Sequence, residues 1–365
     1  MNAHASVTPS LAVAAPPLGQ VYFYLTQGCN CRCRHCWVEP RFDPKAALGT
    51  LPVETFAAVI REAMPLGLRG VKLTGGEPLL HPRILDILGI VRREGPRLTA
   101  ETNGMLCTPE VAAAIARIPD SHVSVSLDGV DPGTVDRIRG VRGAYSGAIA
   151  GIGRLVDAGI RPQLIMSLLR SNVGQAEEFL SLAQRLGAAS VKFNIVQPIA
   201  RGGRLHQDGD TPGIRELIEL GRSLEEKQKS EAWPRIIFDI PPAFISLRQL
   251  TEDGTVPCGI RGIIGVLPTG EYALCGIGEL IPELVFGAAG KQALADIWLR
   301  NESLASIRKG LPGRLQGVCG RCLLKGRCLG KCIAQNYYRS RSLFAPHWFC
   351  ERAEEEGLFP QTRLR

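Results

Sequence analysis

The stretch from Gln20 to Cys36, QVYFYLTQGCNCRCRHC, decides the fold. Its first half is apolar and aromatic, which is typical of a β-strand, and it runs directly into a loop of clustered cysteines. Clustered thiolates suit zinc or iron–sulfur clusters. Three ligands with the spacing Cys29-x3-Cys33-x2-Cys36 leave one iron of a four-iron cluster open, ready to bind a small molecule. The alternative is a closed zinc loop that also uses Cys31 or His35.

Composition favours an ordinary soluble globular protein. The chain has 365 residues, of which 45% are hydrophobic, and a formal charge of +8. Arginine is spread along the sequence without a basic block, so a solvated surface is favoured over nucleic-acid binding. No window approaches the roughly 18 apolar residues of a membrane span, and residues 1–19 resemble a loose tail rather than a targeting signal. We therefore expect a cytoplasmic protein whose cysteines are ligands rather than disulfides.

Helical and strand patterns alternate after the cysteine loop, which predicts right-handed βαβ units and a parallel sheet. The predicted strands after the first are 69–74, 97–102, 122–127, 162–168 and 190–196. The predicted helices are 53–65, 82–94, 109–117, 145–158 and 174–186. Six units are too few for a closed eight-fold barrel, so the expected fold is α/β, with an open or partial barrel.

Informative residues follow the strand ends, where such folds bind ligands. The second strand ends in LTGGEP (73–78), whose glycines allow backbone to approach a ligand closely. ETNG (101–104) ends the third strand, and VSLDG (125–129) ends the fourth. In RIRGVRG (137–143), Arg139 is suited to a ligand carboxylate. Each motif alone is weak, but their repetition at one edge of one sheet predicts a binding site.

With these motifs, residues 20–205 resemble the radical S-adenosylmethionine superfamily, which implies a (β/α)6 partial TIM barrel. The resemblance implies that Cys29, Cys33 and Cys36 hold a [4Fe–4S] cluster, with His35 beside the last cysteine. It also implies that Gly75, Gly76, Glu77 and Pro78, together with Ser126 and Arg139, contact S-adenosylmethionine. The implied chemistry is reductive cleavage of that cofactor to a 5′-deoxyadenosyl radical, which abstracts hydrogen from a substrate.

Residues 251–365 carry a second cysteine pattern, which resembles the SPASM domain. Its seven cysteines are Cys258, Cys275, Cys319, Cys322, Cys328, Cys332 and Cys350. The resemblance implies two auxiliary [4Fe–4S] clusters, one on Cys319, Cys322, Cys328 and Cys350 and the other on Cys258, Cys275 and Cys332. Some relatives have an eighth cysteine where this chain has Glu252. A pair of zinc sites is the alternative.

Longer stretches, among them VKLTGGEPLLHP and CIAQNYYR, resemble the radical SAM/SPASM peptide maturases of SynChlorMet-type cassettes. The resemblance implies modification or cross-linking of a ribosomally made peptide. It also implies a reductant such as ferredoxin or flavodoxin, and possible help from a separate leader-recognition protein. Sulfatase maturases carry Asp where this chain has Gly276, which counts against their activity. The alternatives are radical oxidation or rearrangement of a small molecule, and a non-catalytic iron–sulfur electron carrier or scaffold.

The segment 206–250 is expected to connect the two regions. Its first part predicts a helix capped by Asp210 or Thr211 with Pro212 at the first helical position. WPRIIFDIPPAFISL (233–247) predicts a strand with a Pro-Pro break. Just beyond it, IIGVLPTGEYALCG (263–276) predicts a hairpin that brings Cys258 and Cys275 together.

Overall fold

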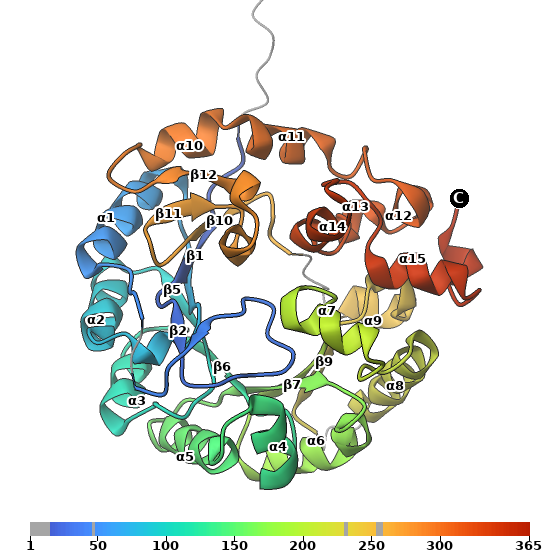
Figure 1. The fold of residues 1–365 in the computed structure, drawn as a ribbon, viewed down its shortest axis with the longest axis horizontal. Helices are drawn as coiled ribbons and strands as arrows, with labels where there is room; N and C mark the ends of the chain where they lie inside the picture. Colours follow the sequence, from blue (N-terminus) through green and yellow to red (C-terminus); the bar gives the residue numbers. More distant parts are fainter. Residues whose placement is uncertain (1–14, 46–47, 230–232, 253–257) are drawn as a thin grey trace, which may run out of the picture.

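One curved sheet organises the chain. The computed structural model describes residues 15–45, 48–229, 233–252 and 258–365. Ten strands lie in the order β12-β11-β10-β1-β4-β5-β6-β7-β8-β9. Figure 1 shows the strands inside an arc of helices, with the C-terminal segments completing the ring. The predicted α/β fold with a parallel sheet is confirmed.

The eight parallel strands run from β10 through β1 to β9. They are β1 (Gln20–Tyr24), β4 (Gly70–Thr74), β5 (Arg97–Thr102), β6 (His122–Ser126), β7 (Gln163–Leu168), β8 (Ser190–Ile195), β9 (Arg235–Phe238) and β10 (Ile263–Val266). The first six are the strands that the sequence predicts. A short parallel pair, β2 (Gly28–Cys29) and β3 (Arg41–Phe42), lies in the cysteine-loop region.

Most helices of the first region cover the outside of the sheet, and α7 (Ala200–Gln207) lies against the cysteine loop. The others are α1 (Val53–Ala63), α2 (Ile84–Glu94), α3 (Pro109–Ala116), α4 (Pro132–Arg139), α5 (Ala144–Asp157), α6 (Ala176–Arg185) and α8 (Ile214–Gln228). Alternate strand residues such as Val71, Leu98 and Phe193 join the large apolar core with these helices. Because strand side chains alternate, the residues between them face the inside of the barrel.

Two details of the sequence prediction need correction. The helix expected from Asp210 or Thr211 begins at Ile214, with Gly213 as its N-cap, so Pro212 precedes it. Asp210 instead pairs with Arg34 at 2.5 Å, and its carbonyl accepts the Arg170 N–H. The strand expected around residues 233–247 is confined to Arg235–Phe238, and Pro242–Phe244 form a 3-10 turn.

The C-terminal region adds strands to the same sheet. The predicted hairpin is present: β10 pairs antiparallel with β11 (Glu271–Ala273), which pairs with β12 (Val285–Ala288). Short helices follow: α10 (Leu294–Arg300), α11 (Glu302–Gly310), α12 (Gly317–Arg321), α13 (Lys325–Cys328), α14 (Ile333–Ser340) and α15 (Trp348–Glu355). Figure 1 shows α10 beside α1 and β12, whereas α11 to α15 and α9 (Leu247–Glu252) follow the ring from there towards α8.

Candidate active site

The loop after β1 gathers the predicted cluster thiols. Cys29, Cys31 and Cys33 are buried together, and Cys36 and Met105 pack against them. The four cysteines are free thiols. The Cys31 thiol, and after it the Arg139 guanidinium, lower the pKa of Cys33 to about 5 against the effect of burial. Lowering the pKa favours the thiolate, which is the form that binds metal.

This donor set fits an iron–sulfur cluster better than zinc. Three soft thiol ligands converge in one buried loop, as a [4Fe–4S] cluster with an open iron requires. A single zinc ion needs ligands about 2.0–2.3 Å away. Within the part of the chain that the structure describes, no three His, Cys, Asp or Glu side chains are spaced to hold one metal ion.

The Gly-Gly turn after β4 lies against the cysteine loop. The Gly76 N–H donates to the Thr26 carbonyl, and the Glu77 N–H donates to the Gly28 carbonyl at 3.0 Å. A Cβ on Gly76 would lie 1.9 Å from the Gly28 oxygen, so only glycine fits there. Gly75 has φ of +123°, a second reason for glycine. The turn that the sequence assigns to the cofactor is thus held beside Cys29.

Glu77 holds this turn to the end of β5. Its carboxylate accepts hydrogen bonds from the Thr102 hydroxyl at 2.6 Å, the Asn103 N–H at 2.8 Å and the Leu79 N–H at 3.0 Å. Burial raises the pKa of Glu77, although these bonds act in the opposite direction. Pro78 is buried and begins a 3-10 turn (Pro78–Leu80). These contacts make Glu77 a positioning residue, and its predicted contact with the cofactor stays a prediction.

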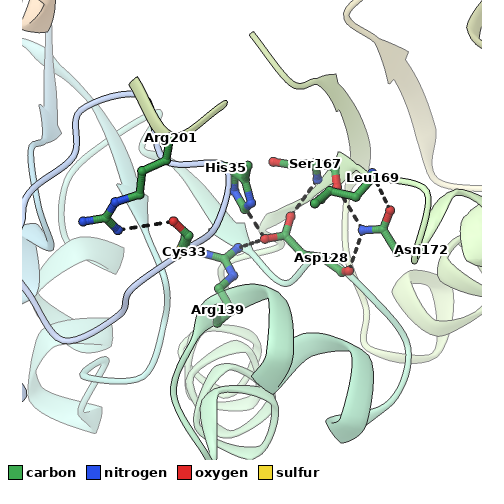
Figure 2. Close-up of polar contacts among 8 residues, drawn as sticks. All are labelled: Cys33, His35, Asp128, Arg139, Ser167, Leu169, Asn172 and Arg201. Carbon is green, nitrogen blue, oxygen red and sulfur yellow. Dashed lines mark hydrogen bonds and ion pairs between the residues drawn. The ribbon is translucent and has the colours of Figure 1, made fainter. Parts of the chain in front are cut away.

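A buried ion pair lies on the other side of the loop (Figure 2). The Asp128 Oδ2 atom is 2.8 Å from Arg139 Nη2 and 3.5 Å from His35 Nε2. Arg139 also donates from Nη1 to Cys33 Sγ at 3.5 Å. Two of the predicted cofactor residues, His35 and Arg139, therefore meet at the carboxylate of Asp128, which the sequence places with Ser126 at the end of the fourth strand. Ser126, half-buried at the end of β6, lies two residues before it.

Helix α7 contacts the same loop. Arg201 Nη1 donates to the Cys33 carbonyl at 3.3 Å, and Arg204 pairs with Glu39 at 2.9 Å. On its other side, His206 packs edge-on against the Trp348 ring, with 4.9 Å between ring centroids. The sequence did not predict α7. Its ARGGRLHQ sequence contains two glycines and lacks a clear apolar face, so periodicity gave no signal.

The inside of the barrel is polar. Glu101, Ser124, Gln163 and Ser190 occupy one register row across β5 to β8, and we call them the polar row. Lys72 Nζ lies 2.6 Å from Glu101 and 4.9 Å from the centre of the Tyr22 ring. Closed barrels of this kind fill their centre with branched apolar side chains. Polar side chains here are suited to contact a ligand.

Four of the seven C-terminal cysteines lie together. Cys319, Cys322, Cys328 and Cys350 line one enclosed pocket. Burial first, and then charge on Cys258 and Cys275, raise the pKa of Cys332, and the assignment of these three cysteines to one cluster stays a prediction. The side chain of Glu252 lies outside the described residues. Cys107 is buried in the main apolar core.

Comparison with known proteins gives one family and a consistent fold. Residues 23–183 match the Radical SAM superfamily. The chain is 26% identical to the AdoMet-dependent heme synthase of Methanosarcina barkeri, over 89% of this chain and 94% of that protein. It is also 26% identical to the PqqA peptide cyclase of Gluconobacter oxydans, over 97% of this chain and 98% of that protein. The crystal structure of Streptococcus suis SuiB bound to the precursor peptide SuiA superposes with a TM-score of 0.72 at 16% identity. That match covers 92% of this chain and 76% of SuiB, and it shows a shared fold.

Proposed function

Because residues 23–183 belong to the radical SAM superfamily, we propose that this chain is a radical S-adenosylmethionine enzyme that modifies a ribosomally made peptide. The observation that carries the proposal is the group of buried Cys29 and Cys33 with partly buried Cys36, held between Gly76 and Arg139. When bound, a [4Fe–4S] cluster and S-adenosylmethionine supply one-electron cleavage of the sulfonium and a 5′-deoxyadenosyl radical that abstracts hydrogen.

The chain's own residues position the cofactor and the substrate and enclose the site. Cys29, Cys33 and Cys36 are the ligands, and the Gly75–Gly76 backbone lies where the cofactor's amino group is expected. Arg201 and α7 hold the loop over the barrel mouth. The polar row and Lys72 face the inside of the barrel, where their hydrogen-bonding groups can orient a substrate.

Similar proteins whose names include a peptide support a peptide substrate. The PqqA peptide cyclase of Gluconobacter oxydans matches nearly the full length of this chain, and SuiB is solved with a precursor peptide.

We propose that the seven C-terminal cysteines hold two auxiliary [4Fe–4S] clusters. A ferredoxin or flavodoxin would supply electrons, and a separate protein could present the peptide's leader. No described helix is long and apolar enough to cross a bilayer.

A second candidate function is radical oxidation of a small molecule. The match to the AdoMet-dependent heme synthase of Methanosarcina barkeri supports it, because that relative also aligns over most of both chains. The two candidates differ in substrate and share the cleavage step. The test adds either a precursor peptide encoded beside the gene or a tetrapyrrole to the assay. The true substrate should raise 5′-deoxyadenosine formation above the substrate-free rate, and the compound that does so identifies the function.

The cleavage step is tested first. Anaerobically reconstituted protein is given S-adenosylmethionine and dithionite, and 5′-deoxyadenosine and iron are counted per chain. Three [4Fe–4S] clusters correspond to about twelve irons. We expect nucleoside from the unchanged protein and none from Cys33→Ala, because an open-iron site needs all three thiols.

Cys31→Ala is the matched control, since Cys31 lies in the same loop and is not one of the three assigned ligands. It should retain its irons and its nucleoside yield. Equal yields from Cys33→Ala and the unchanged protein would overturn the ligand assignment. Iron binding without nucleoside in the unchanged protein would favour the electron-carrier or scaffold alternative.

A further inference from the structure

Arg139 joins a cluster ligand to a buried carboxylate. One guanidinium nitrogen donates to Cys33 Sγ at 3.5 Å, and another lies 2.8 Å from Asp128 Oδ2. Arg139 is 6% exposed and Asp128 is fully buried. Charges in such surroundings are weakly screened, so each affects its neighbours more than a surface charge does.

The fold fixes the Asp128 carboxylate firmly. Asp128 has φ of +68°, an uncommon conformation for a residue other than glycine. Its Oδ1 atom accepts the Ser167 N–H at 2.6 Å, and its carbonyl accepts the Asn172 amide at 2.9 Å. Asn172 in turn bonds the Ser167 carbonyl and accepts the Leu169 N–H (Figure 2). Backbone from the end of β7 therefore holds the carboxylate that orients Arg139.

Hydrogen bonds and positive charge at a ligand thiolate stabilise the reduced form of an iron–sulfur cluster, which carries one more negative charge. A carboxylate beside that positive charge opposes the effect. We propose that Arg139 raises the reduction potential of the cluster held by Cys33, and that Asp128 limits the rise. Both are positioning residues that set how readily the cluster accepts one electron from its reductant.

This assignment rests on the proposed function, because it requires a cluster at the loop. The sequence predicts that Arg139 contacts the carboxylate of S-adenosylmethionine. Setting the reduction potential of the cluster is a separate role for the same residue. The assignment predicts opposite effects from removing the two partners. Asp128→Asn leaves the arginine charge unbalanced, so the potential should rise. Arg139→Gln leaves the carboxylate unbalanced, so the potential should fall.

The experiment is a potentiometric titration of the N-terminal cluster, followed by electron paramagnetic resonance without S-adenosylmethionine. We expect each single variant to change the reduction equilibrium about tenfold, or about 59 mV for one electron, in opposite directions. The double variant should lie between the two single variants. Arg139→Lys keeps the charge and should lie nearer to the unchanged protein than Arg139→Gln does.

Asp210→Asn is the matched control. Asp210 also pairs with an arginine of the loop, Arg34, but both side chains are partly exposed, so screening should leave the potential unchanged. Shifts of the two single variants in the same direction, no shift, or loss of iron from both would overturn the assignment and leave the pair a structural one. A lack of any cluster signal in the unchanged protein would overturn the proposed function as well.

Discussion

At the residue scale, Gly276 shows how one missing side chain shapes the site. A Cβ on Gly276 would lie 2.2 Å from Cε1 of Tyr24 and 2.6 Å from its hydroxyl oxygen. Tyr24 is buried against Leu267 and Ala273, so its ring cannot move aside. The position where sulfatase maturases carry Asp is therefore filled here by a tyrosine ring from β1. The physical reason for glycine is space, which the sequence could not reveal.

The substitution Gly276→Ala should destabilise the protein by about 1–3 kcal/mol, the usual cost of overpacking a core. Gly153→Ala in α5 is the control, because nothing lies within 4 Å of its added Cβ. That variant should gain about 0.5–1 kcal/mol from reduced backbone entropy in the unfolded chain. Anaerobic thermal unfolding of both variants measures the difference. A Gly276→Ala variant as stable as Gly153→Ala would contradict the packing of Tyr24.

Residue types at the site were more predictable than their partners. The cysteine spacing indicated a loop of three ligands, and the structure gathers those three thiols. Glu77 and Arg139 were expected beside a cofactor, yet their bonds go to Thr102, Asn103 and Asp128. Asp128 lies far from His35 in the sequence, and only the barrel brings the two segments together. Pairings of this kind depend on folding and leave no local pattern.

At the element scale, α7 connects the cysteine loop to the C-terminal region. Trp348 of α15 donates from its indole N–H to the Gln197 side chain at 2.8 Å, just before α7 begins. Gly202 lets the helix approach this segment, because an added Cβ would lie 2.2 Å from the Gln197 carbonyl oxygen. The neighbouring Gly203 has only ordinary contacts, the nearest at 3.7 Å.

These two glycines give a paired prediction. Gly203→Ala should be neutral or stabilise the protein by about 0.5–1 kcal/mol. Gly202→Ala should destabilise it by at least about 1 kcal/mol and shift Gln197 away from Trp348. Thermal unfolding and the tryptophan fluorescence spectrum of each variant test this difference. Identical behaviour of the two variants would mean that α7 does not pack closely on the Gln197 backbone.

Elements with strong periodicity were predicted, and elements without it were missed. The six strands and five main helices have apolar residues at regular spacing, so their positions follow from the sequence. Helix α4 begins at Pro132 and has one glycine and three charged residues among its eight, so periodicity did not predict it. The start of α8 was wrong because Asp210 makes a tertiary ion pair instead of a cap. Tertiary partners overrode local propensity in that case.

At the scale of the whole molecule, the cysteine loop gathers one group of thiols, and Cys319, Cys322, Cys328 and Cys350 line a pocket in the C-terminal region. Cys328→Ala should remove one auxiliary cluster and leave the N-terminal cluster in place, because the pocket of four thiols loses one ligand. Iron should fall from about twelve to about eight per chain. Iron analysis with electron paramagnetic resonance measures both effects, and an unchanged iron count would contradict the pairing of these four cysteines.

The first strand has neighbours from both ends of the chain. β1 pairs with β4 on one side and with β10 on the other, where Gln20 lies opposite Ile263. During synthesis, β1 leaves the ribosome long before β10 exists, so one of its edges stays without hydrogen bonds. Open strand edges promote aggregation. The nascent chain therefore needs protection of its first strand until translation has passed residue 266. Slow translation late in the message would lengthen the period in which this edge can aggregate.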